Sequence, residues 1–167
     1  ELEKKNILSR ITFLNEIEKN IEDSDLVVEA ATERKDVKFN IFQKLDKICK
    51  AETILASNTS SISITEIGSK TNREEKVIGM HFMNPVPIMK LVEVIKGKKT
   101  SNKTFETIMH LSKQLGKTPV FVNDAPGFVA NRILMPMINE AILTLEQNIS
   151  GVEEIDTVMI LGMSHPM

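Results

Sequence analysis

Apolar segments of strand length alternate with helical patterns along most of the chain. The expected strands are 11–14, 26–30, 53–56, 77–83, 91–95 and 120–122. Between the second and third of these, apolar residues recur at helical spacing over 37–48, and Thr32 is the expected N-cap. Further helices are expected over 62–69 and from about 103 to 115, where Gly116 follows. This alternation predicts an α/β fold with a doubly wound, largely parallel sheet.

The expected strand 77–83 carries a histidine, His81, and stops at Asn84-Pro85. Both of its faces are largely apolar, which favours a strand covered on both sides in a parallel sheet. Gly79 lies two residues earlier on the same face, and we expect it to leave open space beside the ring. His81 therefore lies near the carboxyl end of a buried strand, where open α/β sheets bind ligands. The alternative is a core histidine that is hydrogen-bonded to a backbone carbonyl.

Glu93 lies within the apolar segment MKLVEVI, residues 89–95. A buried carboxylate needs a partner, because burial without one costs several kcal/mol. If its strand runs beside the strand of His81, the carboxylate can bind one ring nitrogen, set the tautomer and raise the basicity of the other nitrogen. That arrangement is typical of general base catalysis. The alternative places Glu93 on an edge strand, where its side chain points to water.

Two further clusters carry polar side chains, ASNTSS at 56–61 and PGFVANR at 126–132. The hydroxyl of Ser60 and the amide of Asn131 could hold a substrate oxygen opposite His81. Each has a structural alternative: serine-rich turns satisfy local backbone groups, and an amide near a helix start bonds to the backbone.

From residue 128 to about 146 the helical pattern leaves almost no polar face. Such a helix is expected to be buried on most sides, between domains or between subunits, and Pro136 is expected to kink it. Another helix is expected over 151–161. We therefore expect a dinucleotide-binding domain over 1–124 and the start of an all-α C-terminal domain over 125–167.

The composition is that of a globular protein, with a formal charge of −2, 41% hydrophobic and 26% charged residues. No apolar run approaches the roughly 20 residues of a spanning helix. Trp and Tyr are absent and no basic cluster stands out, so neither a membrane nor nucleic acid is an expected partner. No metal site is expected. The single cysteine, Cys49, excludes an internal disulfide and suits a cytoplasmic location.

The clusters together resemble the L-3-hydroxyacyl-CoA dehydrogenase family, most closely its bacterial 3-hydroxybutyryl-CoA dehydrogenases. The resemblance runs over nearly the whole chain, from LVVEAATERKDVK through ILASNTSS, VIGMHFMNPVPIMKLVEVI and DAPGFVANRIL to VEEIDTVMILGMSHPM. It implies a partial Rossmann-like domain followed by a helical dimerisation domain. It also implies NAD(P)-dependent oxidation of (S)-3-hydroxyacyl-CoA to 3-oxoacyl-CoA, in fatty acid or butanoate metabolism.

The resemblance implies an active site built from Ser60, His81, Glu93 and Asn131. His81 would take the proton of the 3-hydroxyl while hydride leaves the same carbon. Glu93 would orient the imidazole and support its charge. Ser60 and Asn131 would position the substrate oxygens.

The resemblance also implies nucleotide contacts at Glu33, Lys38, Ser60 and Asn84, with NAD or NADP as the cofactor. In structural terms, Glu33 and Lys38 would be ordinary solvated charges. The glycines form no G-x-G-x-x-G motif, so we expect an internal fragment of a longer, homodimeric enzyme, with no useful turnover as an isolated chain.

Three rival interpretations remain. The protein could act on a hydroxy acid or sugar acid without CoA on the same fold. It could be the dehydrogenase portion of a fatty-acid oxidation multienzyme, or a non-catalytic structural relative.

Overall fold

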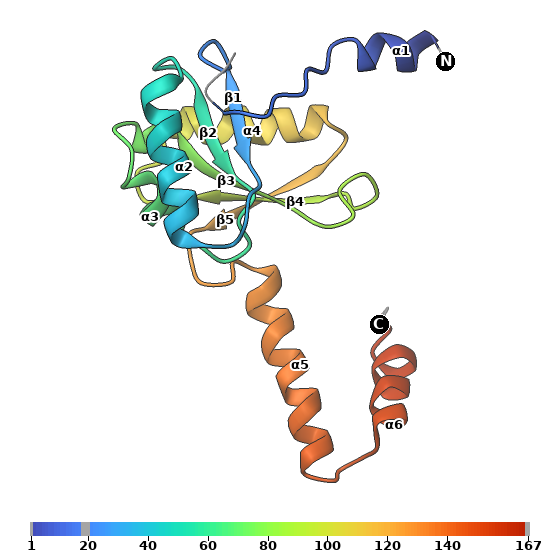
Figure 1. Ribbon diagram of the computed structural model, residues 1–167. Helices are drawn as coiled ribbons and strands as arrows, with labels where there is room; N and C mark the ends of the chain where they lie inside the picture. Colours follow the sequence, from blue (N-terminus) through green and yellow to red (C-terminus); the bar gives the residue numbers. More distant parts are fainter. Residues whose placement is uncertain (1, 18–20, 166–167) are drawn as a thin grey trace. The chain divides into compact units, whose positions relative to one another are not determined.

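The computed structural model describes residues 2–17 and 21–165 and forms two compact units, Glu1–Asp124 and Ala125–Met167 (Figure 1). Each unit is described by itself. The first contains α1 (Leu2–Leu8), β1 (Leu26–Glu29), α2 (Lys35–Ile48), β2 (Ile54–Ser57), α3 (Ile64–Gly68), a 3₁₀ turn (Glu74–Lys76), β3 (Val77–Phe82), β4 (Leu91–Lys96), α4 (Asn102–Gln114) and β5 (Thr118–Asn123). The second contains α5 (Ala130–Glu146), α6 (Val152–Thr157) and a π-helical turn (Val158–Gly162).

The first unit is built on a five-stranded sheet of order β1-β2-β3-β4-β5. Strands β1, β2 and β3 run parallel, and β4 runs parallel to β5. Strand β3 is antiparallel to β4, so the expected parallel environment of β3 is correct on one side only. The short connection over 83–90 explains the difference, because parallel neighbours need a crossover of a dozen or more residues.

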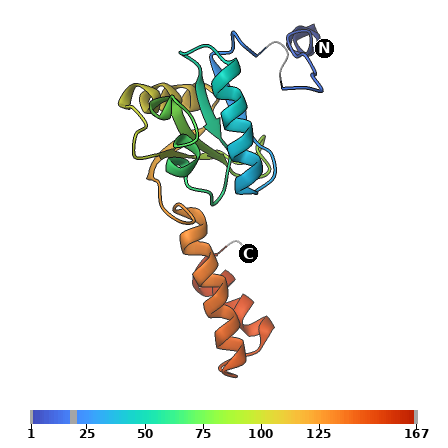
Figure 2. The same ribbon diagram turned by 60° about the vertical axis from the view of Figure 1, so that its left-hand side comes forward.

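Helices cover both faces of the sheet, with α4 on one side and α2 and α3 on the other (Figures 1 and 2). Alternate strand residues pack toward α4 and form a core with Ile108. That core contains Ile54, Ala56, Ile78, Met80, Val92 and Val94. The intervening residues face α2 and α3, where Phe42 and Ile67 are fully buried. The expected α/β, Rossmann-like class is confirmed in this unit.

Helix boundaries follow local signals in three cases and depart from them in one. The side chain of Ser63 caps α3 and that of Ser101 caps α4, each by accepting a hydrogen bond from a backbone N–H of the first turn. Gly116 follows α4 with a φ of +73°, as expected of a glycine after a helix. The expected cap of α2 at Thr32 is wrong. The N-cap is Arg34, without a side-chain bond, because the helix starts three residues after Thr32.

Two local expectations are wrong, the first for lack of a neighbouring strand in the described part of the chain and the second because of close tertiary packing. The segment 11–14 forms no strand; it is irregular, and Phe13 is 91% exposed. A strand needs a neighbour to hydrogen-bond with, and the described residues give this segment none. The expected open space beside Gly79 is also absent. A Cβ atom on Gly79 would lie 2.7 Å from the Cβ of Ile95 and 3.0 Å from Cδ1 of Ile64, so the glycine permits close packing.

Helix α5 has no buried residue, and Pro136 lies inside it. Its exposed apolar side chains include Ile133, Met135, Ile138 and Ile142. The expectation that this helix is mostly buried is therefore not met within the chain itself. Across the described part of the chain, no helix combines the length and apolar character that a membrane-spanning segment requires.

Candidate active site

His81 and Glu93 form a buried pair in the first unit. They are directly opposite each other in the antiparallel ladder of β3 and β4, and Nδ1 of His81 lies 2.8 Å from Oε2 of Glu93. The two residues are 6% and 1% exposed. The expected adjacency of the two strands is confirmed. The edge-strand alternative for Glu93 is wrong, because β4 lies between β3 and β5.

The pair lies on the α2 and α3 face, near the carboxyl end of β3. When the ring is neutral, Glu93 accepts a hydrogen bond from Nδ1–H, so an acid–base role of this histidine would fall to Nε2. When the ring is protonated, the carboxylate stabilises the imidazolium. The alternative of a core histidine bonded to a backbone carbonyl is not supported, since the partner at Nδ1 is a carboxylate.

Three further predicted residues, Glu33, Lys38 and Ser60, lie together where β1 and β2 end. Nζ of Lys38 lies 3.5 Å from Oε2 of Glu33. The other oxygen, Oε1, accepts hydrogen bonds from the backbone N–H of Ser60 at 2.9 Å and of Ser61 at 3.1 Å, and from the hydroxyls of Ser61 and Thr59. Glu33 thus fixes the serine-rich turn that carries Ser60.

These contacts control the ionisation of Glu33. Partial burial by itself would raise the pKa of this carboxyl. The hydrogen bonds from Thr59, Ser60 and Ser61, together with the charge of Lys38, outweigh burial and lower the pKa below its ordinary value. Glu33 is therefore a carboxylate at neutral pH, and its Oε1 is already committed to the turn.

Lys38 is buried, so the interpretation as a solvated lysine is wrong. Its ammonium donates hydrogen bonds to Oε1 and Oε2 of Glu29 at 2.7 and 2.9 Å. Glu29 also accepts a hydrogen bond from the hydroxyl of Ser57 at 2.7 Å. Sequence reasoning missed Glu29 and Ser57. A signal existed for Glu29, since it lies in the apolar run LVVEA just as Glu93 lies in LVEVI.

Asn58 and Asp124 were also missed, and both connect distant segments. The side-chain oxygen of Asn58 accepts a hydrogen bond from the backbone N–H of Phe82 at 2.8 Å, which links the end of β2 to the end of β3. Asp124 accepts hydrogen bonds from the Ser63 hydroxyl and from the N–H groups of Ile64 and Thr65. These contacts join residues 24 and about 60 positions apart, so no local pattern reveals them.

The two predicted asparagines, Asn84 and Asn131, lie in different units of the chain. Asn84 is exposed in the loop that follows β3. The same loop is held by Lys117, whose ammonium donates to the carbonyls of Val86 and Met89. Asn131 lies in α5, in the second unit. The roles of both asparagines stay predictions.

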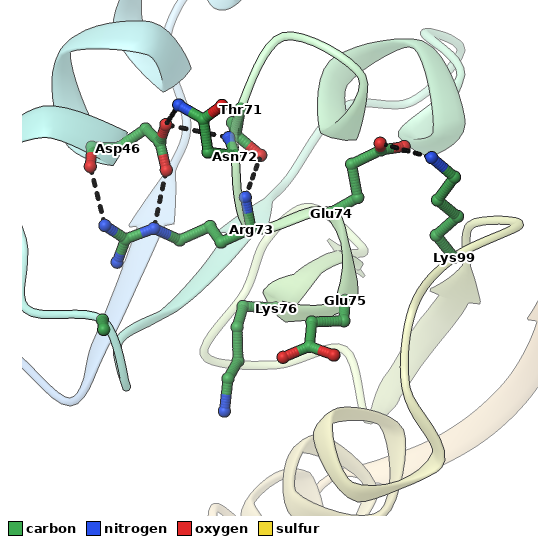
Figure 3. Close-up of a pocket in the computed structure, with 9 residues that line it drawn as sticks. Asp46, Thr71, Asn72, Arg73, Glu74, Glu75, Lys76 and Lys99 are labelled. Atoms are coloured by element: carbon green, nitrogen blue, oxygen red, sulfur yellow. Dashed lines mark hydrogen bonds and ion pairs between the residues drawn. The ribbon is translucent and has the colours of Figure 1, made fainter.

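A hollow of about 970 Å³ lies at the opposite edge of the sheet, before the amino ends of β2 and β3 (Figure 3). Four of its charged side chains form two ion pairs, Arg73 with Asp46 and Lys99 with Glu74, each at 2.7 Å. The Arg73 guanidinium also binds carbonyls at the end of α2. We therefore assign this hollow a structural role and place the candidate active site at His81.

Other candidate chemistry is weak in the described part of the chain. Cys49 is buried, and burial raises the pKa of its thiol, which disfavours a nucleophilic thiolate. Residues 2–17 and 21–165 contain no group of three or more His, Cys, Asp or Glu side chains placed to hold a metal ion.

Comparison with known proteins gives this site a family. The family model described as "3-hydroxyacyl-CoA dehydrogenase, NAD binding domain" matches residues 1–125, and the one described as "3-hydroxyacyl-CoA dehydrogenase, C-terminal domain" matches residues 127–167. The chain belongs to the 3-hydroxyacyl-CoA dehydrogenase family. The resemblance inferred from the sequence motifs is confirmed.

Individual members of the 3-hydroxyacyl-CoA dehydrogenase family are similar over nearly all of this chain. The 3-hydroxybutyryl-CoA dehydrogenase of Clostridioides difficile is 54% identical, over 98% of this chain and 58% of that protein. The probable 3-hydroxybutyryl-CoA dehydrogenase of Bacillus subtilis (strain 168) is 54% identical, over 100% and 58%. The crystal structure of (S)-3-hydroxybutyryl-CoA dehydrogenase from Ralstonia eutropha matches with a TM-score of 0.95 and 48% identity, over 99% and 58%. The chain thus spans somewhat more than half the length of these relatives.

Proposed function

We propose that the protein containing this chain oxidises (S)-3-hydroxyacyl-CoA to 3-oxoacyl-CoA with a nicotinamide dinucleotide, and that 3-hydroxybutyryl-CoA is its substrate. The observation that carries the proposal is the buried His81–Glu93 pair at the edge of the sheet where β1, β2 and β3 end. Similarity to proteins named 3-hydroxybutyryl-CoA dehydrogenase supports the substrate.

In this proposal, Nε2 of His81 accepts the proton of the 3-hydroxyl as the hydride leaves the same carbon. In the reductive direction, Nε2 returns that proton to the carbonyl oxygen. Glu93 holds the ring and balances the charge of the imidazolium. Ser60 and Asn131 hydrogen-bond the substrate oxygens and fix the reacting carbon.

The bound nucleotide supplies the hydride acceptor. Residues Glu33, Lys38 and Asn84 are proposed to contact it, together with Ser60. The geometry of the first unit fits this role, because Glu33, Lys38 and Ser60 meet where β1 and β2 end, the place at which open α/β sheets bind ligands. A comparison of NADH with NADPH in the assay identifies the preferred nucleotide.

The test uses the native protein that contains this sequence. We expect it to oxidise NADH or NADPH in the presence of acetoacetyl-CoA, which is measured as a loss of absorbance of the reduced nucleotide. Free acetoacetate, which lacks CoA, should react very slowly. Equal rates on the two substrates would instead favour a dehydrogenase of CoA-free hydroxy acids. A total lack of turnover with every pair would contradict the enzyme proposal.

The matched variants are His81→Asn and His110→Asn. His110 is an exposed histidine on α4, so its replacement controls for the loss of an imidazole. We expect His81→Asn to lower kcat by about 100-fold or more, the usual contribution of a positioned acid–base group, and His110→Asn to leave kcat unchanged. Similar kcat values for both variants would contradict the role of His81.

A further inference from the structure

The side chains of Glu29, Lys38 and Ser57 form a buried polar cluster beneath the serine-rich turn. Both Glu29 and Lys38 are almost completely buried, at 5% and 1% exposure, and Ser57 is fully buried. Oε1 of Glu29 accepts hydrogen bonds from Lys38 Nζ and from the backbone N–H of Ala31 at 2.6 Å. Oε2 accepts hydrogen bonds from Lys38 Nζ and the Ser57 hydroxyl. Each oxygen of the carboxylate therefore accepts two hydrogen bonds.

Stability alone is a poor reason for this cluster. Removing an ammonium and a carboxylate from water is costly, and apolar residues of similar volume often stabilise a core as well or better. Buried ionic groups with fully satisfied hydrogen bonds do restrict geometry, because each partner holds the others in one arrangement. The cluster is therefore a candidate for positioning whatever lies next to it.

A continuous series of contacts leads from the cluster to Ser60. The ammonium of Lys38, held by Glu29, lies 3.5 Å from Oε2 of Glu33. Glu33 in turn accepts hydrogen bonds through Oε1 from the N–H groups of Ser60 and Ser61. Ser57 adds a second link, since its hydroxyl oxygen accepts a hydrogen bond from the N–H of Thr59 at 3.2 Å.

We propose that Glu29 is a positioning residue for the proposed nucleotide and substrate site. It holds Lys38 where the ammonium faces Glu33, and Glu33 then holds the turn that presents Ser60. Glu29 acts through Lys38 and Ser57 and has no contact of its own with nucleotide or substrate. This inference has a structural half, that Glu29 holds the turn through Lys38 and Glu33, and a functional half, that this placement favours nucleotide binding. Only the functional half rests on the proposed dehydrogenase activity.

The structural half is tested with Glu29→Gln, which keeps the volume of the side chain and removes its charge. In this variant Glu33 is the only carboxylate left of the two that pair with Lys38, so the ammonium pulls Glu33 away from the turn. We expect the amide protons of Ser60 and Ser61 to exchange with solvent about tenfold faster or more, the scale of one charge-assisted hydrogen bond. Exchange in β4 should change little. Site-resolved hydrogen exchange of the native protein measures both.

The matched control is Glu66→Gln, which removes an exposed carboxylate that pairs with another lysine of α2, Lys35, at 2.6 Å. We expect exchange at Ser60 and Ser61 to stay at the native rate in this control. Native exchange in Glu29→Gln, or equally fast exchange in both variants, would overturn the inference.

A double variant covers the case in which Glu29→Gln does not fold. Glu29→Leu with Lys38→Met replaces both buried charges by apolar side chains, a change that proteins often tolerate. We expect this variant to fold and still to show faster exchange at Ser60 and Ser61, because Glu33 has lost its neighbouring ammonium. A folded double variant with native exchange there would overturn the inference.

The functional half is read in steady-state kinetics of the same variants. We expect Glu29→Gln to raise the KM for the nucleotide about tenfold and to lower kcat less, and Glu29→Asp, which keeps the charge, to recover part of the loss. An unchanged KM would overturn the functional half. A native protein without dehydrogenase activity would contradict the proposed function and would leave the exchange test of Glu29 intact.

Discussion

Single buried charges define the proposed site of this protein. Glu93 and Glu29 both lie inside apolar strands, and each carboxylate binds one cationic or titratable side chain, His81 and Lys38 respectively. A carboxylate in such a place needs hydrogen bonds or a nearby positive charge to offset its lost hydration, so its partners restrict its position. The consequences can be tested one residue at a time.

Replacement of Glu93 by glutamine should lower kcat about tenfold to 100-fold with little change in the KM for acyl-CoA. The amide keeps a hydrogen bond to the ring of His81 and loses the charge that stabilises the imidazolium. Steady-state kinetics of the native protein measures both constants, and Glu106→Gln, an exposed change on α4, serves as the control. An equal kcat in both variants would count against the pairing as part of the mechanism.

Replacement of Asp124 by asparagine should destabilise the protein in a pH-dependent way. Burial alone would raise the pKa of Asp124, but the hydrogen bonds from Ser63, Thr65 and Ile64 outweigh it and lower the pKa below the ordinary value of 3.8. Because the pKa is lower in the folded than in the unfolded protein, this stabilisation is complete above the unfolded pKa. It is lost as the pH falls through the folded pKa.

We therefore expect Asp124→Asn to cost about 1–2 kcal/mol at neutral pH, the usual value of a helix-capping carboxylate. The difference from the native protein should shrink as the pH falls from about 4 toward 2. Urea unfolding at several pH values measures it. A difference that stays constant over this range would show that the charge of Asp124 is not responsible.

At the scale of elements, α2 depends on a residue far outside it. The last carbonyls of a helix have no partner within the helix. Here Arg73 supplies one, donating hydrogen bonds to the backbone oxygens of Asp46 and Cys49 at 2.7 and 2.9 Å and to that of Lys50. Asp46 also pairs with its guanidinium. Lys38 lies in the first turn of α2, so the position of this helix sets the position of Lys38 in the proposed site.

Replacement of Arg73 by alanine should lower the free energy of unfolding by about 2–3 kcal/mol, because it leaves the Asp46 carboxylate and several carbonyls without a charged donor. Lys99→Ala is the matched control in the same hollow. Its ion pair with Glu74 is largely exposed on the lysine side and should contribute less than about 1 kcal/mol. Similar losses for both variants in urea unfolding would contradict the special role of Arg73.

At the scale of the whole molecule, the second unit exposes apolar side chains that a monomer rarely leaves in water. On α5, Ile138, Ile142 and Leu145 recur at helical spacing and are all exposed. We propose that this surface contributes to the contact of a homodimer, the association that the resemblance to the dehydrogenase family implies.

Replacement of Ile142 by lysine should therefore weaken self-association about tenfold or more, since it places a charge on an apolar contact surface. The mean mass in light scattering as a function of concentration measures the effect, and unchanged far-UV circular dichroism shows that the helix is intact. Ser150→Lys, a change outside α5, controls for the added charge. Association that is equally strong in both variants would argue that α5 does not mediate it.

The amino-acid sequence by itself determined the elements whose signals are local. Periodicity placed β3, β4 and α4 almost at their observed bounds, because apolar spacing and caps such as Ser101 act within a few residues. Motif order also gave the family. The sequence also predicts that Glu93 binds His81 if their two strands are adjacent, because a buried carboxylate needs a partner.

Only the tertiary structure decided what depends on long-range contact. The segment 11–14 has the composition of a strand but no neighbouring strand among the described residues, so it stays irregular. Lys38 looks like a surface lysine in the sequence, yet it is buried and pairs with Glu29, whose carboxylate also accepts a hydrogen bond from Ser57 on the adjacent strand. Strand β4 is antiparallel to β3 because the chain reverses direction over 83–90, and this orientation places Glu93 opposite His81. Hydrogen bonds and ion pairs between segments distant in sequence leave no local pattern. Which charged side chains are buried depends on the strands that meet in the folded sheet, so the sequence alone does not reveal it.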